Sequence, residues 1–137
     1  MKNEVTYRTF DFDRNIHELL YNSKLWITEF QFFQIELAFI KLLFKSYPFK
    51  TKIPNLFENI QLFILELDGF EKDRNDIINK LNFNAVSLNN KIENNELALS
   101  NLNLIDEEKL AEEVFNFKKN YTHLKSRIYE YISGLIN

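Results

Sequence analysis

The sequence predicts an all-α protein that folds as an elongated, antiparallel three-helix bundle running up, down and up. Two glycines and two prolines in 137 residues are too few for sheet-rich folds, which need turn residues about every 10 positions. Apolar residues instead recur at alternating steps of three and four in three long segments, as in helices that pack together in coiled coils and bundles. We therefore expect a single domain over residues 1–137, with helices over about 13–46, 55–95 and 106–136.

The first predicted helix, over residues 13–46, carries the longest apolar series. Asp13 can cap its start, because a short carboxylate accepts hydrogen bonds from the free amides of the first turn. Pro48 marks its end, because the residue before a proline is biased away from the helical conformation. The series contains one polar member, Ser23, and consists of Phe12, Ile16, Leu19, Ser23, Trp26, Phe30, Phe33, Leu37, Ile40, Phe44 and Tyr47. This face is expected to pack against the other helices.

The second predicted helix, over residues 55–95, starts near Pro54, which suits a first turn because its missing N–H is no loss there. Gly69 costs about 1 kcal/mol relative to alanine, but the apolar spacing continues on both sides of it. The series is Leu56, Ile60, Phe63, Leu67, Phe70, Arg74, Ile77 and Leu81, and after a one-residue slip it continues as Ile78, Leu81, Ala85, Leu88 and Ile92. A break near Asn82 to Asn84 is the alternative, and it would give a four-helix variant.

The third predicted helix, over residues 106–136, has the most regular series. Asp106 is the expected N-cap, and Glu107 and Glu108 give an acidic first turn that suits the helix dipole. The apolar positions are Leu110, Val114, Phe117, Tyr121, Leu124, Ile128, Tyr131 and Leu135. Because short loops join long helices, neighbouring helices are expected to be antiparallel.

The composition argues against most catalytic and cofactor-binding sites. With no cysteine, disulfides, thiolate metal sites and cysteine nucleophiles are excluded, and two histidines are too few for sites that need several imidazoles. The two glycines stand alone, so no glycine-rich loop can bind phosphate. A net charge of -3 argues against a nucleic-acid surface. We expect no catalytic residue, no metal, no cofactor and no nucleic-acid partner, and therefore no enzyme.

The chain is expected to be cytoplasmic and to lack a membrane span. A secretory signal needs an apolar run of roughly 7 to 15 residues near the start, and the first 15 residues contain none. A spanning helix needs about 20 largely apolar residues, whereas the most hydrophobic stretch, residues 30–44, is interrupted by glutamine, glutamate and lysine.

A buried polar layer is predicted around Arg74, which falls on the apolar series of the second helix. A buried charge needs a partner that offsets its lost hydration. If the first two helices fold back on each other, Arg74 comes near the level of Trp26 and Glu29. We expect it to pair with Glu29 and to stack on Trp26, in a structural rather than a catalytic role.

The first helix also carries a second apolar stripe, on a different face from its main series. It consists of Leu25, Phe32, Ile35, Phe39 and Leu42, and we expect Leu62 and Leu65 of the second helix to extend it. A three-helix bundle buries one broad face of each helix, so this surface is in excess. Large exposed apolar patches usually mark an association surface, a membrane contact or a ligand groove.

The run Leu25-Trp26, Glu29-Phe30, Phe33 and Glu36-Leu37 is followed by a Phe-rich second helix and by Phe117, Tyr121, Leu124 and Tyr131. In this order the chain resembles small uncharacterised all-helical proteins of Bacteroidetes-type bacteria. The resemblance covers most of the chain. It implies a long-helix bundle in a bacterial cytoplasm and carries over no catalytic residue.

Two functions are compatible with these features. The first is an interaction module that forms a homodimer through the second stripe, or that binds another protein there. The alternative is a bundle that binds an apolar small molecule or lipid in its interior, for which 14 Phe, 6 Tyr and one Trp provide the material but no set of polar anchors.

Overall fold

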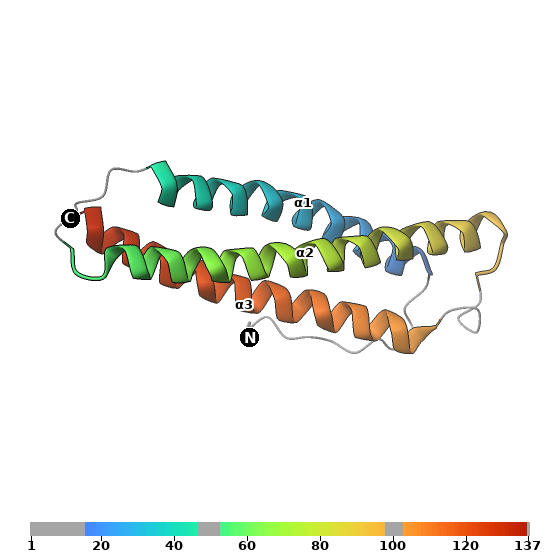
Figure 1. Cartoon of the computed structure of the whole chain (residues 1–137). Coiled ribbons are helices and arrows are strands. Elements are labelled where there is room, and N and C mark those ends of the chain that lie inside the picture. The colour runs from blue at the N-terminus through green and yellow to red at the C-terminus, as the bar shows by residue number, and fades with distance from the viewer. Residues whose placement is uncertain (1–15, 47–52, 98–102, 137) are drawn as a thin grey trace.

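The computed structural model describes residues 16–46, 53–97 and 103–136, and these form three long helices (Figure 1). The helices have 31, 38 and 33 residues. The predicted all-α, three-helix fold is confirmed, and no strand occurs in the described ranges. The helices are α1 (Ile16–Ser46), α2 (Leu56–Glu93) and α3 (Leu104–Ile136).

Polar contacts between the helices give their directions. Two ion pairs between α1 and α3 each join residues that are 89 positions apart, so these helices run the same way. Along α1, Ser23 contacts Asn84 of α2, whereas the later Lys41 contacts the earlier Asp68, so α2 runs the opposite way. The bundle is therefore up, down and up, as Figure 1 shows.

The core is divided into two groups of buried apolar side chains. The main cluster extends from Phe30 to Phe44 on α1, from Leu56 to Leu81 on α2 and from Leu110 to Leu135 on α3. The end cluster consists of Ile16, Leu19, Leu20 and Leu88, with Ala85, Ile92 and Leu104 packed against it. The residues that separate the two clusters are polar.

The start of α3 differs from the prediction. The helix begins at Leu104, two residues earlier than expected, and Asn103 takes the capping position in place of Asp106. Asn103 Oδ1 accepts the backbone N–H of Asp106 at 3.1 Å, and Asn103 Nδ2 donates to an Asp106 carboxylate oxygen at 2.8 Å. Asp106 is the third helical residue, so the bond from its backbone N–H to Asn103 is the one that caps the helix.

The start of α2 also differs slightly from the prediction. Pro54 lies before the helix, because Asn55 adopts a left-handed conformation with φ 59° and the helix begins at Leu56. The predicted cap Asp13 and the predicted stop Pro48 lie outside the described residues.

The predicted alternative of a break in α2 is wrong, because the helix is continuous through Asn82 to Asn84. Leu81 lies before this segment and Leu88 after it, and both are buried, so the apolar face continues across it. Gly69 also lies inside the helix, and a side chain at this position would meet no neighbouring atom. The four-helix variant is therefore excluded.

None of the helices in the described ranges combines the length and the apolar character that crossing a membrane requires.

The burial of Leu67 in the core predicts that replacing a leucine of α2 by alanine destabilises the protein much more at residue 67 than at residue 65. Leu67 is fully buried and Leu65 is 65% exposed. We expect Leu67→Ala to lower the free energy of unfolding by about 2 to 5 kcal/mol, because it leaves a cavity, and Leu65→Ala to change it by at most about 0.5 kcal/mol. Urea unfolding followed by circular dichroism measures both. Similar losses for the two variants would contradict the assignment.

Candidate functional site

The predicted stripe on α1 is exposed to solvent. Its five side chains have exposed fractions between 46% for Leu25 and 67% for Ile35, although all five are large and apolar. They lie on the side of α1 that is turned away from the buried residues such as Phe30 and Leu37, because residues two or five positions apart point to opposite sides of a helix. The stripe thus forms an apolar face of α1 without a partner among the described residues.

The stripe is longer and more regular than predicted. Tyr21 is 66% exposed, and it lies four residues before Leu25. With Tyr21 and the exposed Thr28 included, the positions advance by alternating steps of four and three without a gap. The complete stripe, called the α1 seam below, is Tyr21, Leu25, Thr28, Phe32, Ile35, Phe39 and Leu42. Its spacing is that of the a and d positions of a coiled coil.

The predicted extension of the stripe by Leu62 and Leu65 of α2 is not formed, although both side chains are exposed. They line a hollow between α2 and α3, together with Glu66, Arg127 and Tyr131. The side of α2 that contacts α1 carries different residues, Asp68 and Glu71, which both accept from Lys41 at 2.6 Å. Leu62 and Leu65 therefore belong to another face of the bundle.

One flank of the α1 seam carries two carboxylates, and both are paired with lysines of α3. Lys118 donates to Glu29 at 2.9 Å, and Lys125 donates to Glu36 at 3.0 Å. The hydroxyl of Tyr121 donates to the same Glu36 oxygen at 2.9 Å. Burial and the nearby Glu36 carboxylate both raise the pKa of Tyr121, so its hydroxyl remains a donor.

The other flank of the seam is neutral to basic and is exposed along its length. It consists of Lys24, Gln31, Ala38 and Lys45. Within the described part of the chain, Lys24 and Lys45 make no ion pair. On α1 itself, one flank therefore carries two lysines without an ion pair, and the other carries two carboxylates, each of which is paired with a lysine of α3.

Arg74 is buried, with 4% of its surface exposed, but its predicted partners are wrong. Nη1 donates to the backbone carbonyl of Phe30 at 2.9 Å, and Nη2 donates to Asn75 Oδ1 at 2.5 Å. Glu29 points to α3 instead, since adjacent residues of a helix point about 100° apart. Trp26 packs against the main cluster, and the described residues show no stacking between its ring and Arg74.

The guanidinium of Arg74 is incompletely satisfied. Its Nε is buried and lacks a hydrogen-bond partner among the described residues. Burial lowers the pKa of Arg74, and the nearby Glu71 carboxylate partly opposes this effect. The cation is therefore held by a backbone carbonyl and an amide rather than by a carboxylate, which fits a packing role better than a binding role.

The structure contains a second polar group that the sequence analysis does not predict. Its one sign in the sequence is Ser23, the polar member of the apolar series of the first helix. The Asn84 amide donates to Ser23 Oγ and to a Glu107 carboxylate oxygen, both at 3.0 Å. These residues join all three helices, and we call them the three-helix polar layer. On every helix the layer lies between the end cluster and the main cluster. Burial raises the pKa of Glu107, while the hydrogen bond from Asn84 lowers it in part.

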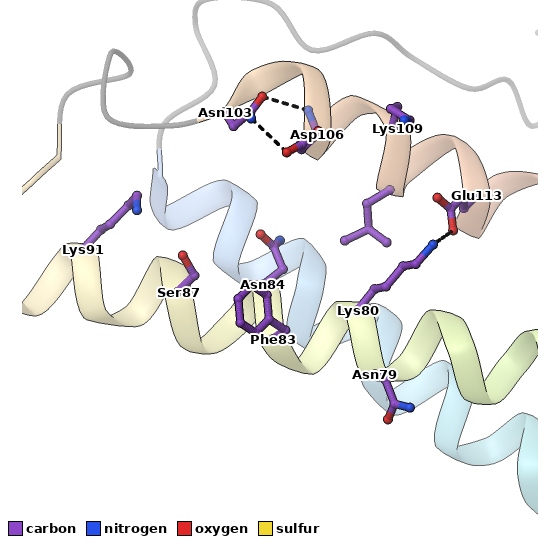
Figure 2. Close-up of a pocket in the computed structure, with 11 residues that line it drawn as sticks. Asn79, Lys80, Phe83, Asn84, Ser87, Lys91, Asn103, Asp106, Lys109 and Glu113 are labelled. Atoms are coloured by element: carbon purple, nitrogen blue, oxygen red, sulfur yellow. Dashed lines mark hydrogen bonds and ion pairs between the residues drawn. The ribbon is translucent and has the colours of Figure 1, made fainter.

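A hollow lined mostly by polar residues, with Phe83 and Leu110 among them, lies next to this layer between α2 and the start of α3 (Figure 2). Lys80 of α2 donates to Glu113 of α3 at 2.9 Å, and Figure 2 shows this pair across the hollow. Lys91 and Lys109 also line the hollow, together with several amide side chains and Asp106. Because both signs of charge are present, the hollow has no single charge that would select an ionic ligand.

The aromatic side chains that could have lined an interior ligand site contact one another instead. The rings of Phe30 and Phe117 lie 4.9 Å apart, and those of Phe33 and Tyr121 lie 5.2 Å apart. Phe70 of α2 also packs against Phe117, at 5.5 Å. These rings pack between the helices at the centre of the bundle, so they contribute to the packing of the described helices.

Neither a metal site nor a known relative points to a function. Among the described residues, no group of three or more His, Asp or Glu side chains is placed to hold a metal ion. Comparison with models of known families, with curated proteins and with solved structures finds no match. The resemblance to small bacterial all-helical proteins therefore stays a prediction.

The environment of Arg74 predicts that its charge is dispensable for folding. We expect Arg74→Met to be as stable as the wild type or more stable by up to about 4 kcal/mol, because an apolar chain of similar length needs no hydrogen bonds. Arg74→Ala should be less stable than Arg74→Met, because it leaves a cavity. Denaturant unfolding compares the three proteins. A loss of several kcal/mol in Arg74→Met would show that the cation itself is needed.

The raised pKa of Glu107 predicts a pH-dependent effect of Glu107→Gln. A carboxyl group with a raised pKa in the folded state favours folding in its protonated form, so its contribution falls as the pH rises from its ordinary pKa through the raised one. We expect Glu107→Gln to match the wild type near pH 4 and to be more stable at pH 7. Thermal unfolding across this range tests the prediction, with Glu112→Gln at an exposed position of α3 as the control. A lower stability of Glu107→Gln at pH 7 would contradict it.

Proposed function

We propose that the chain is a non-enzymatic interaction module that associates with a second copy of itself through the α1 seam. The observation that carries this proposal is the exposure of the α1 seam, in which six of the seven side chains are large and apolar, on a helix whose other face is already buried in the bundle. A cytoplasmic location is part of the same proposal and rests on the sequence alone. No catalytic residue, cofactor or nucleic acid is assigned.

The energy available from this surface supports association. Side chains of this size contribute about 1.5 to 3 kcal/mol each when they are fully buried. The seam offers six such side chains on each copy: Tyr21, Leu25, Phe32, Ile35, Phe39 and Leu42. Together they can offset the association cost of roughly 4 to 15 kcal/mol.

A second copy is favoured over an unrelated partner by the regularity of the seam. Side chains at coiled-coil spacing pack best against another helix with the same spacing. A twofold contact also needs only one self-complementary patch, which every copy of the chain already has. Another protein with an amphipathic helix is the alternative occupant.

The proposal predicts a dimer that depends on Phe39. The purified protein should have twice the chain mass by light scattering at micromolar concentration, and Phe39→Glu should be a monomer that keeps its helicity, because a buried charge without a partner opposes association. The matched control is Phe83→Glu on α2, which makes the same change at a side chain that is 79% exposed outside the seam. This control should remain a dimer.

Three results would contradict the proposal. A monodisperse wild-type monomer would show that the chain does not associate with itself. A Phe39→Glu variant that stays dimeric would place the contact elsewhere. A Phe39→Glu variant that loses its helical signal would assign Phe39 to the core rather than to the surface.

A further inference from the structure

We infer that the two copies pair through α1 in parallel and in register, so that each position of the α1 seam meets the same position of the partner. This inference rests on the proposed function and adds the geometry of the contact. The apolar content of the seam does not decide the direction. In an antiparallel pair Leu25 would meet the partner's Leu42, and Phe32 would meet the partner's Ile35, so both arrangements bury large side chains.

The charges on the two flanks decide between the arrangements. In a parallel coiled coil, a residue on one flank faces the partner residue five positions further on, on the other flank. Lys24 then faces the partner's Glu29, and the symmetry of the dimer forms this pair twice. Lys24 is exposed and makes no ion pair in the described part of the chain. Glu29 is part-exposed, and its contact with Lys118 is made through Oε1, so its second oxygen can accept from Lys24.

The antiparallel arrangement brings like charges together instead. In an antiparallel coiled coil each flank faces the same flank of the partner. In the register that pairs Leu25 with the partner's Leu42, Lys24 faces the partner's Lys45, and neither lysine makes an ion pair in the described part of the chain. Glu29 also faces the partner's Glu36, although each of these carboxylates is paired with a lysine of α3. Each contact would again occur twice. Like-charge contacts are a known means of excluding a wrong pairing.

A charge reversal at Lys24 separates the two arrangements, because its effect has opposite signs in them. In the parallel dimer, Lys24→Glu replaces two attractive pairs by repulsive ones, and we expect the dimer dissociation constant to rise about 2- to 30-fold. In the antiparallel dimer the same change would pair residue 24 with the partner's Lys45 and lower the constant. Sedimentation equilibrium at low salt measures it.

The matched control is Lys119→Glu, at an exposed position of α3 that lies outside the seam. It makes the same change in net charge and should leave the dissociation constant within about twofold of the wild type. A tighter dimer with Lys24→Glu, or an effect equal to that of Lys119→Glu, would overturn the parallel arrangement while leaving self-association intact. A monomeric wild type would overturn the proposed function itself.

A single cysteine at Thr28 tests the register directly, because the chain has no cysteine of its own. In the parallel dimer the two copies of residue 28 face each other, so mild oxidation of Thr28→Cys should give a covalent dimer. In the antiparallel dimer they would lie about 16 Å apart along the axis, beyond the roughly 4.4 to 6.8 Å between Cα atoms that a disulfide spans.

Two controls complete the cross-linking experiment. Lys119→Cys reports collisional cross-linking between unassociated molecules. An oxidised mixture of Leu25→Cys and Leu42→Cys should give two homodimers, resolved by mass spectrometry. A mixed disulfide between these two variants, together with no cross-link in Thr28→Cys, would establish the antiparallel arrangement and overturn the inference.

Discussion

The register of the three helices depends on a few polar groups placed among apolar ones. Apolar series with steps of three and four pack almost equally well after a shift of one turn, about 5.4 Å. The three-helix polar layer removes this freedom, because the Asn84 amide has one donor for Ser23 and one for Glu107. A shift would leave these groups without partners, at a cost of about 1 to 3 kcal/mol each. Arg74, bonded to the carbonyl of Phe30, sets the same register of α1 and α2 at a second level.

With the register set, α1 has two surfaces with different roles. One face is buried in the main cluster, and the α1 seam on the opposite face is exposed. Glu29 and Glu36 lie between them and attach α1 to α3 through Lys118 and Lys125. These ion pairs are part-exposed, so they contribute little to stability. The burial of the apolar face of α1 in the main cluster sets the rotation of the helix, and this rotation decides which residues face solvent.

Much of this architecture is predictable from the sequence. The three helices and their buried faces follow from the apolar spacing alone, and the exposure of Leu25, Phe32 and Ile35 follows from the excess of apolar faces on one helix. The partners of polar side chains do not follow, because Glu29 and Phe30 are neighbours in sequence but point to different helices. The expected position of Leu62 beside α1 is wrong for a similar reason. The spacing shows that a side chain lies outside the core, but it does not show which neighbouring helix the side chain lies beside.

The position of the three-helix polar layer along the bundle has a consequence for how the protein moves. Among the described residues, the end cluster beyond the layer has four buried apolar side chains, whereas the main cluster has many more. The polar layer separates these two groups of buried side chains on all three helices. We therefore expect this end of the bundle to open at a lower free energy than the main cluster does.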